Sequence, residues 1–361
     1  MHSNWTLFTS LCRILGGRDG SALPHAVEQD MIHQQVDTAR QLGLLPALAT
    51  RIEERPEIML QAPEPESQLL QQALQDNTRD NMQAVMQAVK LARSLNKHGI
   101  TPTFLKGTAL LLTIHKERLG FRRQVDIDLV VAPAELRSAC QALLDDGYAF
   151  YRLAATATGQ PETYNDIEEA FKTSAAHHHL PPMYKPGYRL SVELHRHHLP
   201  ARLQRRNPLP ELINGAHLHK DHDAEFLTPS AEHQIIHIIL GKMVHDGCLA
   251  RREFPVREAC DYIDLQEGLS GTIDEQRITR HCGDKYAIFS QLVAELTGYT
   301  NGNTPARKAD IARRLKLMER RYNTPLVADM LNVHARATYL GQTMVHSPAK
   351  LPQYLKRLLS A

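Results

Sequence analysis

Two aspartates alternate with aliphatic residues in a strand-like run, Gln-Val-Asp-Ile-Asp-Leu-Val-Val, over residues 124–131. A period of two places Asp126 and Asp128 on one face of a strand, roughly 7 Å apart, and Ile127 and Leu129 on the other face. Two like charges there repel each other unless a cation lies between them. Mg²⁺ binds carboxylate oxygens together with substrate phosphates, so the pair predicts a phosphoryl-transfer site. An exposed edge strand with two solubilising charges is the alternative.

A glycine turn stands upstream of this run. A short apolar segment ends at Lys106-Gly107-Thr108, and residues 109–114 then read as the buried start of a helix. A strand that turns through glycine into a helix offers free N–H groups and a dipole that attract phosphate. Lys106 adds a charge, Thr108 a hydroxyl, and Arg122 a guanidinium fork for phosphate oxygens. The alternatives are an ordinary turn at Gly107 and a solvated Lys106.

A third carboxylate lies on a second alternating segment, residues 188–195. Its aliphatic residues share one face, and Glu193 and His195 share the other. If this strand pairs beside the aspartate strand, Glu193 can act as a general base for an attacking hydroxyl or as a further metal ligand. His195, two residues on, is a candidate for a supporting role near a nucleotide. A half-buried surface glutamate is the alternative for Glu193.

Together these segments resemble a known family. The residues that carry the resemblance are Leu105-Lys106-Gly107, Arg122-x-x-x-Asp126-Ile127-Asp128-Leu129-Val130-Val131 and Val192-Glu193-Leu194-His195. They are similar to the bacterial uncharacterised nucleotidyltransferase family of the DNA-polymerase-beta-type nucleotidyltransferase superfamily. The similarity extends in looser form from the N-terminal helices to about Leu265, where His245 and Arg257-x-x-x-Asp261 match a helical pattern of that family.

The resemblance implies an α+β fold, with a small mixed sheet flanked by helical N-terminal and C-terminal regions. It implies Mg²⁺, with Mn²⁺ as an alternative, held by Asp126 and Asp128 with Glu193 as the third acid. It also implies an NTP, with ATP as the first candidate, placed by Gly107 and Thr108. The chain departs from the superfamily in having Gly-Thr where Gly-Gly or Gly-Ser is usual, and in the 17 residues of segment 109–125.

We therefore interpret the chain as an Mg²⁺-dependent enzyme that moves an NMP from an NTP to an acceptor and releases pyrophosphate. The acceptor classes that stay open are a small molecule, a peptide, a protein and the end of an RNA. A different class is a catalytically silent nucleotide-binding or scaffold protein with the same fold. The expected catalytic and metal-binding residues are Asp126, Asp128 and Glu193, and the expected nucleotide-binding residues are Lys106, Gly107, Thr108, Arg122 and His195.

The pattern of apolar residues divides the chain into three regions: helical over 1–97, the nucleotidyltransferase core over 98–228, and helical over 229–361. The expected strands cover 100–105, 126–131, 148–153, 171–179 and 188–195, with a loop over 154–166. The expected helices cover 30–45, 64–96, 134–145, 231–244, 256–265, 274–296, 306–322 and 326–340.

Composition indicates a cytoplasmic protein. The 361 residues are 42% hydrophobic, enough for a full core, and 42 basic against 40 acidic residues leave a net charge of +2 that attracts no nucleic acid. The five cysteines are scattered without a C-x-x-C pair, which predicts free thiols and no disulfide partner. No apolar run has the length needed to cross a bilayer, so we expect no membrane association.

Two further features admit other partners. His177-His178-His179, near His195, offers imidazoles for a transition metal, but in a strand His177 and His179 face one way and His178 the other. Residues 307–321 form a locally basic helix that could follow an RNA backbone. A solvated helix face explains that helix more simply, because it lacks interleaved aromatic residues for base stacking.

Overall fold

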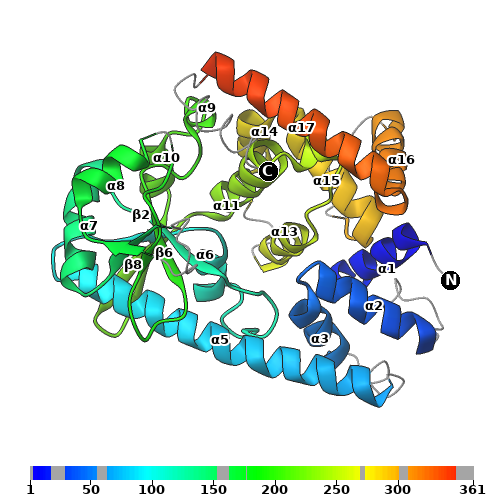
Figure 1. Cartoon of the computed structure of the whole chain (residues 1–361), viewed down its shortest axis with the longest axis horizontal. Helices are drawn as coiled ribbons and strands as arrows, with labels where there is room; N and C mark the ends of the chain where they lie inside the picture. The colour runs from blue at the N-terminus through cyan, green and yellow to red at the C-terminus, as the bar shows by residue number, and fades with distance from the viewer. Residues whose placement is uncertain are drawn as a thin grey trace. The chain divides into compact units, whose positions relative to one another are not determined.

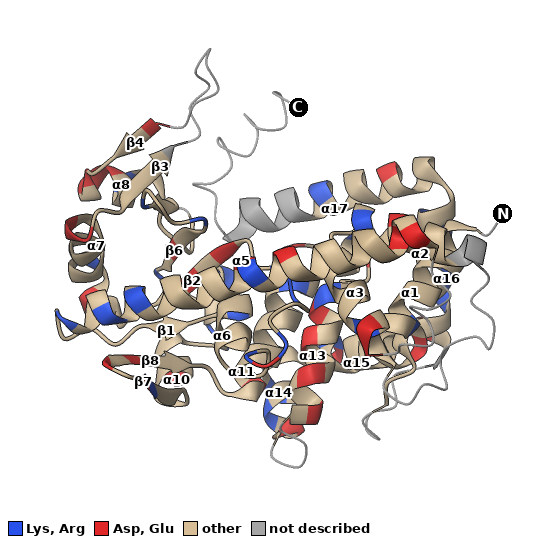
Figure 2. Cartoon of the chain, turned by 90° about the horizontal axis from the view of Figure 1, so that it is seen from below, with Lys and Arg blue, Asp and Glu red and all other residues tan. Residues whose placement is uncertain are grey.

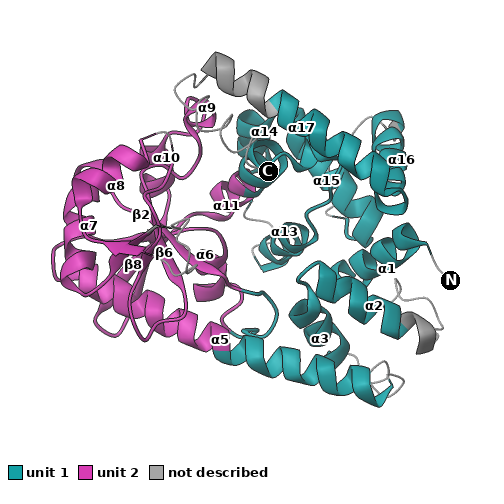
Figure 3. Ribbon diagram, in the orientation of Figure 1, with its two compact units in different colours: residues 1–79, 117–123, 238–361 teal, residues 80–116, 124–237 magenta. Residues whose placement is uncertain are grey.

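The computed structural model describes residues 3–17, 29–54, 63–152, 162–175, 177–268, 273–300 and 308–346. Its chain forms two compact units (Figure 3). The helical unit comprises residues 1–79, 117–123 and 238–361, and the sheet unit comprises residues 80–116 and 124–237. Helix α5, Glu64–Asn96, has the expected bounds and contributes to both units. The division into three regions stays a prediction.

The sheet unit contains one eight-stranded mixed sheet, and the α+β fold class is confirmed (Figure 1). The strand order is β4-β3-β5-β6-β2-β1-β8-β7, so the two strands with the predicted acids, β2 and β6, are neighbours in the middle. The strands are β1 Thr103–Phe104, β2 Asp126–Val130, β3 Ala149–Arg152, β4 Glu162–Tyr164, β5 Met183–Tyr184, β6 Ser191–His195, β7 His217–Asp221 and β8 Ala224–Thr228.

Strands β2 and β6 run parallel, with Ile127 opposite Val192 and Asp128 opposite Glu193. The side chains of Ile127, Leu129 and Val192 are fully buried on one face. Because side chains alternate along a strand, Asp128 and Glu193 emerge together on the opposite face. The predicted faces of both strands, and their pairing, are confirmed.

Helices surround this sheet. In Figure 1, α7 and α8 lie to one side of the strands and α6 to the other. The predicted passage from strand to helix near Gly107 is also confirmed, because β1 is followed at once by α6, and the Leu105 N–H donates to the Asp128 carbonyl at 2.9 Å. The helices of this unit are α6 Lys106–Leu112, the 3₁₀ turn Pro133–Glu135, α7 Leu136–Asp145, α8 Ile167–Thr173, α9 Ala201–Gln204, α10 Leu209–Asn214 and α11 Ala231–His237.

The predicted strand over 171–179 is wrong. Helix α8 ends at Thr173, and the Asp166 carboxylate caps its start by accepting from the Glu169 N–H at 3.0 Å. The cap and the single buried residue of this helix, Ala170, explain why a short amphipathic helix forms here. Strand β5 instead pairs antiparallel with β6. In the predicted loop 154–166, residues 162–164 form β4, and residues 153–161 lie outside the described residues.

The hairpin of β7 and β8 was not expected from the sequence. Strand β8 alternates buried and half-buried residues, with Ala224, Phe226 and Thr228 facing inward, and it extends the sheet by pairing parallel to β1. The turn contains His222 with a φ of 54°, a conformation in which histidine is enriched among non-glycine residues. The alternation, though present in the sequence, is short and broken by charged residues.

The helical unit corrects two predicted helices. The helix expected over 30–45 ends before Gly43, whose φ is 68°, and a new helix begins beside Pro46. The helix expected over 274–296 is divided at Gly283, whose φ is 58°. The helices are α1 Asn4–Gly16, α2 Gln29–Gln41, α3 Leu45–Glu53, the π-helix Ile238–His245, α12 Cys248–Arg251, α13 Val256–Gly268, α14 Glu275–Cys282, α15 Asp284–Thr297, α16 Lys308–Asn323 and α17 Pro325–His346.

The surface charges and the cysteines of the described residues do not identify a binding partner. Figure 2 shows basic and acidic residues mixed along α5. Within the described ranges, no helix is both long enough and apolar enough to span a membrane. All five cysteines are buried free thiols.

Candidate active site

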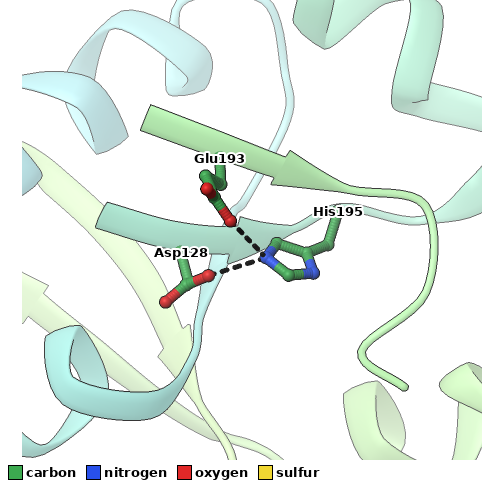
Figure 4. A group of neighbouring side chains, drawn as sticks. All are labelled: Asp128, Glu193 and His195. Atoms are coloured by element: carbon green, nitrogen blue, oxygen red, sulfur yellow. Dashed lines mark hydrogen bonds and ion pairs between the residues drawn. The ribbon is translucent and has the colours of Figure 1, made fainter. Parts of the chain in front are cut away.

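Three side chains from β2 and β6 converge on one point: Asp128, Glu193 and His195 (Figure 4). The His195 Nε2 lies 2.7 Å from Asp128 Oδ1 and 3.7 Å from Glu193 Oε2. One ligand atom from each residue lies within 4.8 Å of the others. The parallel register produces this convergence, because it sets Asp128 beside Glu193 and places His195 one pleat further along the same face.

Lys106 supplies the cation that two neighbouring carboxylates require. Its Nζ lies 2.7 Å from Asp128 Oδ1, the same oxygen that His195 contacts. Lys106 is the first residue of α6 and has a φ of 51°, in the left-handed region that non-glycine residues seldom adopt. Its side chain is 36% exposed, whereas that of Asp128 is 2% exposed. Lys106 is therefore the more exposed partner in its contact with the buried carboxylate.

The charges of this group stabilise one another. Burial opposes the charge of Asp128, but Lys106 and His195 hold the pKa of its carboxyl well below the usual range. Burial likewise opposes the charge of Lys106, yet the carboxylates of Asp128, Glu193 and Asp126 raise its pKa. Burial, helped by the Lys106 charge, lowers the pKa of His195. At neutral pH the group therefore contains an ionised carboxylate, an ammonium and a neutral imidazole.

A neutral His195 next to a carboxylate has a defined tautomer. Its Nε2–H donates to Asp128, so Nδ1 carries the lone pair. Within the described part of the chain, this buried Nδ1 has no hydrogen-bond partner.

Asp126 lies apart from the convergent group. It is half-buried at the start of β2, opposite Ser191, one pleat before Asp128 on the same face. Its charge nevertheless acts on Lys106. The structure thus brings together Asp128, Glu193 and His195, and leaves Asp126 beside them.

The nucleotide contacts expected at the start of α6 are only partly accessible. Gly107 and Thr108 are buried, and the Thr108 hydroxyl accepts a hydrogen bond from the Gln124 Nε2 at 3.0 Å. The same Gln124 amide donates to the backbone carbonyl of Asp126. Gln124 thus joins α6 to β2, and sequence reasoning missed it. The sequence did contain a signal for this role, because Gln124 is a polar residue at the boundary of a buried strand.

Arg122 belongs to the helical unit, unlike the rest of the predicted site. Its guanidinium Nε lies 3.0 Å from both carboxylate oxygens of Asp261, whose side chain is buried. A contact between Arg122 and a triphosphate stays a prediction.

The histidine-rich segment differs from its expected form. Residues 177–179 form a bend and an isolated bridge to β6, and the ring centroids of His178 and His179 lie 5.3 and 5.4 Å from that of His195. His178 and His179 therefore approach the same side chain, contrary to the strand prediction. Among the described residues, however, the group of converging ligand atoms includes His195 and none of residues 177–179.

The donor set suits a divalent cation. Two carboxylates and one imidazole converge, and hard divalent ions take carboxylate oxygens while imidazole is a common ligand for transition ions. The Lys106 ammonium already lies 2.7 Å from Asp128 Oδ1, so the group stabilises a positive charge at this oxygen.

Comparison with known proteins assigns the chain to a family. No curated protein and no solved structure gives a match. The model of the family described as "Uncharacterised nucleotidyltransferase" matches residues 29–285, which is more than half of the chain and includes both acidic strands. The chain therefore belongs to this family of uncharacterised nucleotidyltransferases, whose activity is the transfer of a nucleotidyl group.

Proposed function

We propose that the protein transfers an NMP from an NTP, with ATP as the first candidate, to a nucleophilic acceptor and releases pyrophosphate, with Mg²⁺ or Mn²⁺ as cofactor. The observation that carries this proposal is the convergence of Asp128, Glu193 and His195 on one face of two parallel strands, in a chain of this family. The earlier resemblance to the DNA-polymerase-beta-type superfamily points to the same reaction.

Asp128 would hold the divalent ion, with Asp126 and Glu193 beside it. A bound ion supplies charge neutralisation for the phosphates and orients the attacking oxygen. Lys106 would contact the triphosphate, because its side chain is more exposed than those of Asp128, Glu193 and His195 and carries its charge on a flexible stem. Gly107, Thr108 and Arg122 stay proposed nucleotide contacts on the strength of the resemblance.

Glu193 is the member of the group best placed to meet an acceptor. Its side chain is 20% exposed, whereas that of His195 is 0% exposed. In the proposed reaction the acceptor oxygen bonds to the α-phosphorus, and the bond from that phosphorus to the bridging oxygen of the β-phosphate breaks. The acceptor proton passes to Glu193 as general base, and pyrophosphate leaves.

Radiolabelled NTPs test this proposal when incubated with the protein, lysate fractions and either Mg²⁺ or Mn²⁺. We expect label from the α-phosphate, and none from the γ-phosphate, to enter an acceptor, and we expect a chelator to abolish incorporation. Asp128→Asn should be inactive, and Asp145→Asn, an exposed acid on α7, serves as the matched control. Incorporation by Asp128→Asn at the wild-type rate would contradict the site assignment.

A further inference from the structure

One oxygen of the candidate site has two hydrogen-bond donors. Asp128 Oδ1 lies 2.7 Å from the Lys106 Nζ and 2.7 Å from the His195 Nε2. A carboxylate oxygen has two lone pairs, so these two donors use the acceptor positions of Oδ1. A divalent ion can bind this oxygen only if one donor leaves.

The two donors differ in their freedom to leave. His195 is 0% exposed and lies against the rings of His178 and His179, so the surrounding side chains keep its imidazole in place. Lys106 is 36% exposed and carries its charge on a four-carbon stem. Lys106 is therefore the donor that can be displaced.

We propose that Lys106 acts as an internal counter-ion that closes the metal site of the nucleotide-free protein, and that the phosphates of an incoming NTP draw it away from Asp128. This inference rests on the proposed function, because an NTP is the anion that receives the lysine. Lys106 thereby keeps an anionic partner in both states, and Asp128 keeps a cationic one.

The carboxylates around Lys106 and the backbone conformation of this residue both support the role. In the absence of nucleotide, its ammonium is attracted by Asp128, Glu193 and Asp126 together, so a metal ion must compete with it. The triphosphate removes that competition, so metal and nucleotide each increase the affinity for the other. The φ of 51° at Lys106 is the kind of backbone conformation that clusters at ligand clamps and switch regions.

The decisive measurement is the affinity for Mn²⁺ without nucleotide, read from the electron paramagnetic resonance of the free ion. Lys106→Met should bind Mn²⁺ roughly tenfold more tightly than the wild type, the factor that corresponds to about 1.4 kcal/mol for one charge-assisted hydrogen bond. Lys172→Met removes one charge from an exposed position on α8 and should bind as the wild type does. Equal or weaker binding by Lys106→Met overturns the proposal, as does the absence of Mn²⁺ binding from both proteins.

Two further measurements keep the test informative. Lys106→Gln, which is neutral but polar, should also bind Mn²⁺ more tightly, so the outcome does not depend on the folding of one variant. In the wild type, a non-hydrolysable NTP analogue should raise the affinity for Mn²⁺, after correction for chelation by the analogue, and the rise should be smaller in either variant. An equal rise in all proteins contradicts the proposal. If the neutral variants bind Mn²⁺ more tightly but no acceptor is labelled, the counter-ion stands and the proposed reaction fails.

Discussion

Asp128 is the residue on which the site depends most. Its carboxylate is buried, yet its pKa lies well below the usual range because Lys106 and His195 stabilise the charge against the effect of burial. A carboxyl group whose pKa is lower in the folded chain stabilises the fold above its unfolded pKa, and this contribution is lost as the pH falls through the folded value. The acid that prepares the site for a metal thus also contributes to stability.

Asp128→Asn should accordingly lose both Mn²⁺ binding and stability. At neutral pH we expect a lower free energy of unfolding, because the amide cannot replace the charge that faces Lys106. The difference from the wild type should shrink once the pH falls below about 4, the ordinary pKa of aspartate. Urea denaturation at several pH values checks both statements. A variant more stable than the wild type at neutral pH would mean that repulsion among the carboxylates outweighs the contact with Lys106.

Glu193→Gln should separate binding from chemistry. If Glu193 is the general base, nucleotide binding persists through Lys106 and Asp128, whereas turnover falls by roughly 10² to 10⁴ fold. Equilibrium titration with a nucleotide analogue and single-turnover kinetics measure the two quantities. Unchanged turnover would remove Glu193 from the reaction, and loss of nucleotide binding would make it a metal ligand first.

His198 gives the fold a second pH dependence. Burial, with His233 and His195 adding to the effect, lowers the pKa of His198 to about 3. Below about pH 6.5, His198 takes up a proton in the unfolded chain but stays neutral in the folded chain. The stability therefore decreases as the pH falls through this window. In His198→Leu, the slope of unfolding free energy against pH between about 4 and 6.5 should fall by about 1.4 kcal/mol per pH unit. An unchanged slope in urea titrations would mean that His198 is protonated in the folded protein.

The sequence predicted some residues of the site and missed others for a physical reason. Alternation along one strand is a local property, so the faces of Asp128, Glu193 and His195 could be read directly. The contact between Lys106 and Asp128 spans 22 positions, and that between Gln124 and Thr108 spans 16. Such contacts depend on how α6 packs against β2, which no local pattern encodes.

At the scale of elements, the sheet places β2 and β6 side by side, although 60 residues separate the end of one from the start of the other. Long periodic elements such as α5 were predictable, because many turns carry the same signal. Helix α8 and the hairpin of β7 and β8, which are short, were not. Helix α8 depends on a single cap at Asp166, and the hairpin of β7 and β8 is stabilised by pairing with β1, a partner distant in sequence.

Substitution of Gln124 tests whether its side chain joins α6 to β2. Its buried amide donates to both Thr108 and the Asp126 carbonyl, so Gln124→Ala leaves two acceptors without their donor. We expect the free energy of unfolding to fall by about 1–3 kcal/mol, the usual cost of an unsatisfied buried group. Nucleotide affinity should fall as well, since Thr108 would lose its orientation. Gln141→Ala on the exposed face of α7 is the matched control, and equal effects of the two substitutions would argue against a joining role.

At the scale of the whole molecule, the chain passes between the two units several times, at residues 79–80, 116–117, 123–124 and 237–238. The sequence suggested consecutive regions because apolar periodicity reports elements along the chain. It does not report which of them share a core. The segment 117–123 illustrates the difference: it lies within the predicted core region, yet it packs with the helical unit, where Arg122 pairs with Asp261.

The sheet unit should nevertheless fold by itself. Residues 80–237 form one continuous segment that contains all the strands of the described residues, the group around Asp128 and seven residues assigned to the helical unit. Its core includes fully buried Phe104, Leu129 and Phe150, which belong to three different strands. We expect this fragment to unfold cooperatively in urea and to bind Mn²⁺ in a manner that Asp128→Asn abolishes. If the fragment has no cooperative transition, residues 80–237 do not form a stable core by themselves. If it folds but binds no Mn²⁺, the group around Asp128 does not hold the metal by itself.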